Sequence, residues 1–246
     1  MERKRIFIIL TFFMFLLIVH FLYADFRPFN TGEKLVFSVE YGPVKAGTAT
    51  MEISEITMID SIPCFHIVST ERTNSFFSKI FKIDDRYDSY IDTVNLHSLR
   101  FEKHIREGRY KNDQVVEFKQ DIGKAFYSNG EEFPIEPGAK DIIASIYFAR
   151  TLALEVGKSF FINNHTDKKN YNLEIKVLKK ENVETHAGEF DCLMVQLIVE
   201  DGTVFASKGG LIIWLTDDMW KIPVLMRFKI LKIGSFQAKL KEAYFE

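Results

Sequence analysis

The chain has 246 residues, of which 47% are hydrophobic, 14% aromatic and 27% charged. This apolar content can fill a hydrophobic core and excludes a mainly disordered chain. Lys and Arg number 32 against 34 Asp and Glu, so no overall positive field exists to hold nucleic acid. The two cysteines exclude a disulfide framework and a four-thiolate metal site.

The amino terminus has the pattern of an export signal. Residues 2–5 carry three positive charges and one negative charge, and the nineteen residues 6–24 carry none. Ala24 permits cleavage, although Leu22 occupies the −3 position, where a small residue is preferred. A helix of nineteen residues spans about 28 Å, so an uncleaved anchor in the inner membrane is the alternative.

Both outcomes place residues 25–246 outside the cytoplasm, and we expect one exported, periplasmic domain there. If residues 6–24 remain, they are also the part of the chain that contacts the membrane. Without residues 1–24 the formal charge is −4. This overall charge gives the exported body no evident attraction to anionic lipid headgroups.

Most of the body alternates apolar and polar residues with a period of two. Residues 35–41 and 49–53 do so on either side of Gly42-Pro43, which predicts a hairpin. The same alternation recurs at residues 99–106, 171–177, 224–230 and 236–240. Because strict alternation is typical of antiparallel strands with one buried face, we predict a mainly β fold. Its simplest form is one large curved antiparallel sheet or open half-barrel.

Asp141–Leu154 breaks this pattern with apolar residues at helical spacing. Asp141 can cap the start of the helix, and Gly157 lies just past its end. We predict one amphipathic helix here that packs on the apolar concave side of the sheet. A second, shorter helical stretch is predicted over Asn74–Phe81.

Acidic residues cluster at Asp84, Asp85, Asp88 and Asp92, where carboxylates could bind a hard cation or act as an acid–base pair. On a strand, however, Asp85 points to the opposite face from the other three, and Arg86 offsets part of their charge. A solvated strand face is therefore the favoured interpretation. The sequence has no HExxH, GxSxG, GxxxxGK[ST] or GxGxxG motif, so we predict a protein that is not an enzyme and needs no metal or cofactor.

Cys64 and Cys192 both fall in predicted strands. A disulfide between them is geometrically possible in an oxidising compartment. Two buried free thiols are the other interpretation, and the sequence leaves the choice open.

Aromatic and aliphatic side chains form two dense groups. The residues that could line a ligand site are Phe76, Phe77, Ile80, Phe81, Trp214 and Trp220. One interpretation makes them core positions of a Phe-rich sheet. The other makes them the lining of a cavity for an acyl chain, where each buried methylene contributes about 0.8 kcal/mol.

Four segments carry a family resemblance. They are Phe29–Ile53, Asp141–Ile162, Glu184–Val195 and Gly209–Met226, and they resemble the bacterial domain-of-unknown-function 3108 family. That resemblance implies an exported envelope protein with a largely β architecture and supplies no catalytic residues. The expected shape is also similar to the half-barrel of LolA/LolB-type lipoprotein carriers, although no motif here specifies a lipoprotein partner.

Three functions are compatible with these features. A carrier that binds a lipid, acyl chain or other apolar molecule accounts for the export signal, the aromatic content and the helix over the sheet. A structural or assembly factor of the envelope, acting on a protein partner through a sheet edge or the convex face, is the alternative. A hydrolase using scattered carboxylates is the third hypothesis.

Overall fold

The computed structural model describes residues 27–199, 211–230 and 234–245. Within them the chain forms one 14-stranded antiparallel sheet, one α-helix and one 3-10 turn. The strands are β1 (Lys34–Tyr41), β2 (Val44–Ile59), β3 (Ile62–Thr73), β4 (Asp84–Asp92), β5 (Ser98–Glu107), β6 (Tyr110–Lys119), β7 (Lys124–Tyr127), β8 (Glu132–Pro134), β9 (Ser159–Thr166), β10 (Lys169–Thr185), β11 (Gly188–Ile198), β12 (Leu211–Thr216), β13 (Pro223–Ile230) and β14 (Gly234–Tyr244). The helix is α2 (Ile142–Thr151), and the 3-10 turn is η1 (Phe77–Lys79).

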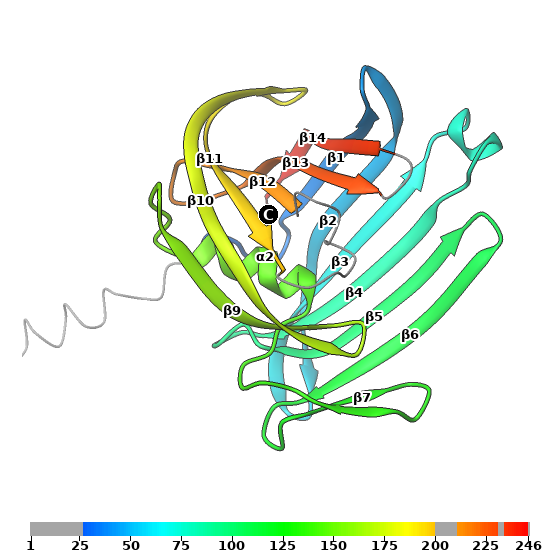
Figure 1. Cartoon of the computed structure of the whole chain (residues 1–246), viewed down its shortest axis with the longest axis vertical. Helices are drawn as coiled ribbons and strands as arrows, with labels where there is room; N and C mark the ends of the chain where they lie inside the picture. Colours follow the sequence, from blue (N-terminus) through cyan, green and yellow to red (C-terminus); the bar gives the residue numbers. More distant parts are fainter. Residues whose placement is uncertain (1–26, 200–210, 231–233, 246) are drawn as a thin grey trace, which may run out of the picture.

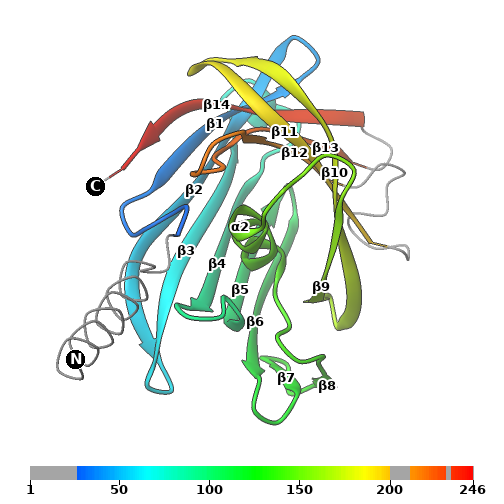
Figure 2. The ribbon, with the colours of Figure 1, turned by 90° about the vertical axis from the view of Figure 1, so that its left-hand side faces the viewer.

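The sheet is strongly curved but is not closed. Its order is β8-β7-β6-β5-β4-β3-β2-β1-β14-β13-β12-β11-β10-β9, so the first and last strands of the chain lie side by side in its middle. The segment between the two edge strands β8 and β9 carries α2, which lies inside the curve (Figures 1 and 2). The predicted fold class, an open antiparallel sheet with one helix packed on it, is confirmed.

Side chains and loops, rather than a ladder of backbone hydrogen bonds, connect the two edge strands of the sheet. The Tyr127 hydroxyl on β7 lies 2.8 Å from Nε2 of His165 on β9. The Asn170 amide donates to the Pro134 carbonyl oxygen at 2.9 Å. These contacts hold the curve while leaving the backbone groups of the two edges unpaired with each other.

Alternation along the strands fills the concave side with apolar residues. Leu35 and Phe37 on β1 and Ile67 on β3 are fully buried there, together with Ala144 and Tyr147 of α2. The helix therefore packs on the concave face at one end of the sheet, as its apolar spacing predicts.

Asp141 caps α2 and also ties it to the sheet. Its carboxylate accepts the Ala144 backbone N–H at 2.9 Å and the hydroxyls of Ser89 and Ser98 at 2.7 and 2.6 Å. The predicted cap is thus present. The helix ends at Thr151, three residues before the predicted end, because the next residue has an extended backbone.

A fully buried ion pair fixes the other end of α2. Arg150 donates to both carboxylate oxygens of Glu33 at 2.5 and 2.7 Å. The same guanidinium donates to the carbonyl oxygens of Pro28 at 2.6 Å and Trp220 at 3.2 Å. One side chain thereby joins the helix, the segment before β1 and the β12–β13 connection.

The outer half of the β10–β11 hairpin crosses the convex face of β14 and β1, as its yellow ribbon shows in Figure 2. The Ala187 N–H donates to the Leu240 carbonyl oxygen, and the His186 ring lies 2.7 Å from the Glu40 carboxylate. Trp214, on the face opposite to its core neighbours in β12, is buried under this hairpin and donates its indole N–H to Glu181.

The second predicted helix is much shorter than expected. Of Asn74–Phe81, only Phe77–Lys79 forms a single 3-10 turn, held by the Asn74 side chain, which accepts the backbone N–H of Phe76 and of Phe77. Residues 6–24, the predicted signal or anchor, lie outside the described residues. Within the described ranges, no helix has the length and apolar content needed to span a bilayer.

Replacing Arg150 by Met should lower the free energy of unfolding by about 3–5 kcal/mol, because it leaves the Glu33 carboxylate buried without its partner. Lys158→Met is the matched control, since Lys158 pairs with Glu155 at the surface and such pairs contribute about 0–1 kcal/mol. Urea unfolding of both variants measures the difference. A loss below about 1 kcal/mol for Arg150→Met would show that the pair does not hold the helix.

Candidate functional site

Three carboxylates lie on the concave face of the sheet, away from the helix. They are Glu71 on β3, Asp85 on β4 and Glu107 at the end of β5. Glu71 and Asp85 are directly opposite each other in the ladder, and Asp85 and Glu107 share a side-chain hydrogen bond. We call these three residues the carboxylate cluster.

The strand pattern explains why these groups point inward. Phe65, Ile67, Ser69 and Glu71 occupy alternate positions of β3 and therefore share one face. Phe65 and Ile67 are buried in the core under α2, whereas Glu71 is exposed. The inner face of β3 thus changes from apolar to acidic toward the carboxyl end of the strand.

The environment of the cluster raises the pKa of all three carboxyl groups. Desolvation, followed by repulsion from Asp85 and Glu107, raises the pKa of Glu71 to about 7. Desolvation is also the first cause that raises the pKa of Asp85, although this carboxylate accepts the Arg106 N–H at 2.6 Å. The pKa of Glu107 is raised by desolvation and then by Asp85.

Glu71 combines two properties that rarely occur together. Its side chain is exposed to solvent, yet the surrounding protein desolvates it strongly enough to move its pKa. A carboxyl group on a flat surface would be fully hydrated and would keep its ordinary pKa. The two observations agree if Glu71 lies in a recess that is walled by the curved sheet and open to solvent.

An aromatic row lies on the same face, across the middle strands of the sheet. Tyr41 on β1 packs against Phe236 on β14 with ring centroids 5.2 Å apart, and Phe236 stacks on Phe228 of β13 at 5.9 Å. Tyr41 is 42% exposed, and Phe228 and Phe236 are intermediate in burial. Ala49 on β2 lies directly opposite Glu71, and Phe37 and Val39 on β1 occupy the inner positions between Ala49 and the aromatic row.

The residues predicted as ligand-binding do not converge. Phe76, Phe77, Ile80 and Phe81 lie together in the β3–β4 connection, outside the core. Trp214 is 3% exposed on the convex side, and Trp220 is 47% exposed in the β12–β13 connection. The structure therefore separates these six residues into three places.

Asp85 lies on the opposite face from Asp84, Asp88 and Asp92, as predicted, but the prediction of a solvated strand face is wrong, because Asp85, Asp88 and Asp92 are all buried. The sequence pattern did not single out Glu71 or Glu107. The signal was a charged residue at an inward position of a strand, where the alternation calls for an apolar one. Such a position can be recognised only after the inner face is known.

Cys64 and Cys192 are both buried free thiols, and the structure does not pair them. They lie on β3 and β11, with five strands between them in the sheet. Burial raises the pKa of Cys192 to about 12, so this thiol is a weak nucleophile at neutral pH.

A Ser54–His66–Asp88 row crosses the other face of β2, β3 and β4. The Ser54 hydroxyl lies 3.1 Å from His66 Nδ1, and His66 Nε2 lies 2.7 Å from Asp88. The Arg86 guanidinium donates hydrogen bonds to both carboxylate oxygens of Asp88. Although burial opposes it, the hydrogen bonds from His66 and Arg86 hold the pKa of Asp88 at about 2. Since Ser54 also donates to the His66 carbonyl oxygen, the row is best explained as a structural cross-strand network.

No group of three or more His, Cys, Asp or Glu residues in the described ranges is arranged to hold a metal ion. The carboxylate cluster instead offers hydrogen-bond acceptors and negative charge. A ligand with hydroxyl or ammonium groups matches this chemistry.

Comparison with known proteins supports the fold. Residues 36–241 match a family described as "Protein of unknown function (DUF3108)", which confirms the resemblance seen in the sequence. No curated protein matches the sequence. The likeness to LolA/LolB-type carriers stays a prediction.

Three solved structures are similar in shape. A β-barrel-like protein of DUF1849 from Brucella abortus has a TM-score of 0.59 at 10% identity, covering 90% of this chain and all of that one (100%). A DUF1089 family protein from Pseudomonas aeruginosa has a TM-score of 0.44 at 10% identity, and the match covers 74% of this chain and 89% of that one. A protein from Parabacteroides distasonis described as a candidate lipoprotein has a TM-score of 0.39 at 11% identity, and the match covers 88% of this chain and 97% of that one. The first supports the β-barrel-like architecture.

Glu71→Gln should make the protein less sensitive to alkaline pH. Because the folded state raises the pKa of Glu71 from 4.5 to about 7, the stability that its protonated form contributes is present below pH 4.5 and is lost as pH rises through 7. After allowance for solvent screening at this exposed side chain, we expect the variant to gain about 1 kcal/mol relative to wild type between pH 4.5 and pH 8.

Urea unfolding at the two pH values measures this gain. Glu189→Gln, at an exposed carboxylate of the β10–β11 hairpin, is the control and should show no such change. If the two variants behave alike, Glu71 is an ordinary surface carboxylate.

Proposed function

This chain belongs to the DUF3108 family, and we propose that it is a non-enzymatic envelope protein that binds an amphiphilic ligand, a lipid or acyl compound, in the open part of its concave face. The observation that carries the proposal is the environment of Glu71, an inward-facing side chain that is exposed to solvent and whose pKa is nevertheless raised first by desolvation. A recess that solvent can reach accounts for both properties. Ligand sites are typically concave, with apolar walls and a few polar groups that fix orientation.

The two sides of the recess suit the two ends of such a ligand. The aromatic row of Tyr41, Phe228 and Phe236 can contact an apolar chain, with about 0.8 kcal/mol for each buried methylene. The carboxylate cluster can accept hydrogen bonds from a hydroxylated or cationic headgroup. A plain hydrocarbon would leave the buried Asp85 carboxylate without new partners, so the polar group belongs in the proposal.

The export signal predicted at residues 1–24 supports a periplasmic location. Under this proposal the exported domain works there, either free after cleavage at Ala24 or held to the inner membrane by residues 6–24. A structural or assembly role through protein contacts is the competing function, and the ligand experiment separates the two.

The test is mass spectrometry of the protein purified from its native envelope, followed by uptake of a fluorescent fatty acid by the delipidated protein. We expect a co-purifying lipid and saturable uptake. Phe236→Asp should reduce uptake at least tenfold, because it places a charge in the aromatic row.

Phe161→Asp is the matched control. Phe161 is an exposed aromatic residue of β9 (60%) that lies next to the inward-facing Ile162 and so points outward. The Phe161→Asp variant should leave fatty-acid uptake unchanged. Circular dichroism should show that this variant and Phe236→Asp are both folded. A mass spectrum without any co-purifying lipid, together with no uptake of the fatty acid, would overturn the ligand proposal and favour the assembly role.

A further inference from the structure

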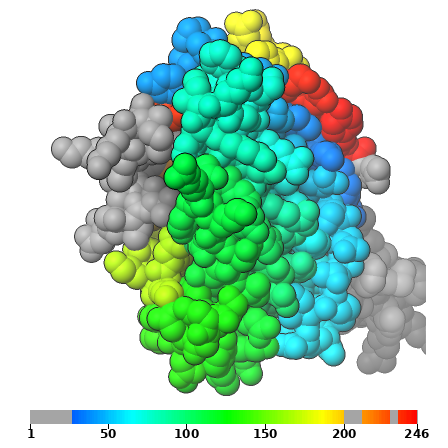
Figure 3. Space-filling view, turned by 90° about the vertical axis from the view of Figure 1, so that its right-hand side faces the viewer, coloured from blue at the N-terminus to red at the C-terminus, as the bar shows by residue number. Residues whose placement is uncertain are grey.

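Three connections meet at one end of the sheet and form what we call the tip rim. They are the β1–β2 turn, the β3–β4 connection and the β5–β6 turn. The Asn74 amide donates to the Lys45 carbonyl oxygen at 2.6 Å, and the Gly108 N–H donates to the Lys82 carbonyl oxygen at 2.7 Å. In Figure 3 the β3–β4 connection, in teal, projects beside the green β5–β6 turn.

The tip rim exposes large apolar side chains from all three connections. They are Val44 (47%), Phe76 (64%), Ile80 (71%), Phe81 (47%) and Tyr110 (58%). None of these five residues belongs to the core cluster of the described chain. Phe76, Ile80 and Phe81 are members of the apolar group found in the sequence. A contiguous exposed apolar surface is typical of an interaction site.

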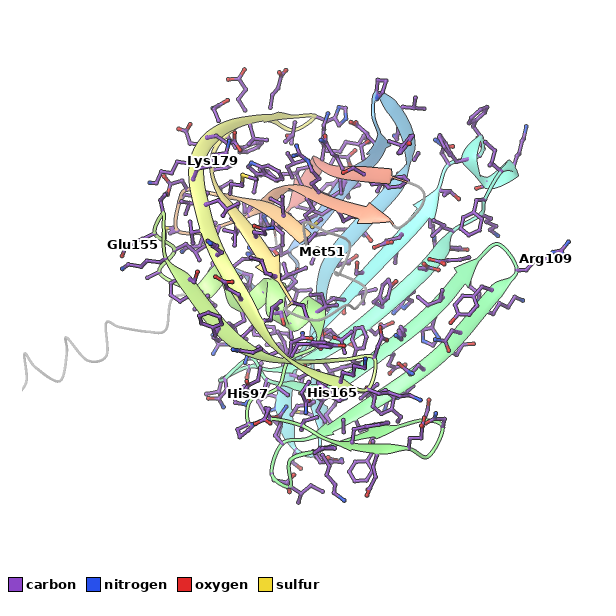
Figure 4. The ribbon with its side chains drawn as sticks, in the orientation of Figure 1. Met51, His97, Arg109, Glu155, His165 and Lys179 are labelled. Carbon is purple, nitrogen blue, oxygen red and sulfur yellow. The ribbon has the colours of Figure 1, made fainter. Side chains whose placement is uncertain are left out.

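Cations stand among these apolar residues. They are Lys45, Lys79, Lys82, Arg109 and Lys111, all exposed. Figure 4 shows Arg109 projecting away from the sheet. None of the five has an ion-pair partner among the described residues, whereas Arg72 and Arg106 nearby are paired with Asp84 and Asp113.

The opposite end of the sheet also exposes apolar residues, but it lacks a comparable group of cations without ion-pair partners among the described residues. Met58 (60%) and Val94 (73%) are exposed there, but Lys119 is paired with Asp60 at 2.7 Å. The positive charge of the tip rim is therefore a local feature of a chain whose overall charge is slightly negative.

We propose that the tip rim docks on an anionic phospholipid bilayer. Phe76, Ile80 and Phe81 enter the interface between headgroups and acyl chains, and the surrounding Lys and Arg side chains contact the phosphates. Apolar residues alone would fit a protein partner equally well. Five unpaired cations around them favour a surface with dense negative charge, which is what an anionic membrane supplies.

Docking at the tip rim also places the carboxylate cluster near the membrane. Glu71 lies two residues before the end of β3, and Glu107 is the last residue of β5. The recess would therefore open beside the lipid surface. The docking proposal does not depend on ligand binding in the recess, and the two are tested by different variants.

Sedimentation with vesicles tests the docking. The protein is used as purified from the envelope, and vesicles of phosphatidylcholine with 30% phosphatidylglycerol are compared with phosphatidylcholine alone. We expect binding to the anionic vesicles that weakens in high salt. Replacing Lys79, Lys82 and Arg109 together by Gln should lower the partition coefficient about 100-fold, or roughly fivefold for each cation.

The double variant Phe76→Ser with Ile80→Ser should lower the partition coefficient at least tenfold. Met58→Ser with Val94→Ser, at the opposite end, is the control and should change it less than twofold. All variants share one amino terminus, so any contribution of residues 6–24 cancels in the comparison. Equal binding to both vesicle types, or unchanged partition in the tip-rim variants, would overturn the proposal. Fatty-acid uptake should persist in these variants.

Discussion

The buried contact between Arg150 and Glu33 is the constraint on which the arrangement of this molecule depends. Removing both charges from water is costly, and the structure offsets this with hydrogen bonds from the guanidinium to Glu33 and to the carbonyl oxygens of Pro28 and Trp220. Those bonds form only when α2, the segment before β1 and the β12–β13 connection come together. The pair therefore sets where the helix lies on the sheet and how much of the concave face it covers.

The position of the helix leaves the inner surface with two parts of different character. Under α2 the inner side chains are apolar and closely packed. Beyond it, β3, β4 and β5 carry carboxylates, and β1, β13 and β14 carry aromatic rings. The acidic positions lie where the helix does not cover the inner face, and of the three only Glu71 is exposed.

Local pattern predicted much of the architecture. Period-two alternation identified the strands around residues 35–41, 99–106 and 171–177, and Asp141 was recognised as a helix cap, because both depend on neighbours in the chain. The same reasoning placed Trp214 among ligand-binding residues. It could not show that the β10–β11 hairpin folds over this indole, since that contact joins Glu181 to a strand 33 residues away.

The sequence by itself determined the class of fold, the alternation of several strands and the capped helix, since these follow from the period and chemistry of adjacent residues. Only the tertiary structure decided which inward positions are covered and which are open. It also brought Glu71, Asp85 and Glu107 together from three strands and gathered the exposed apolar and basic residues of three turns at one end. Curvature of the sheet is the reason, because it sets distances between residues far apart in the chain, and no local pattern encodes it.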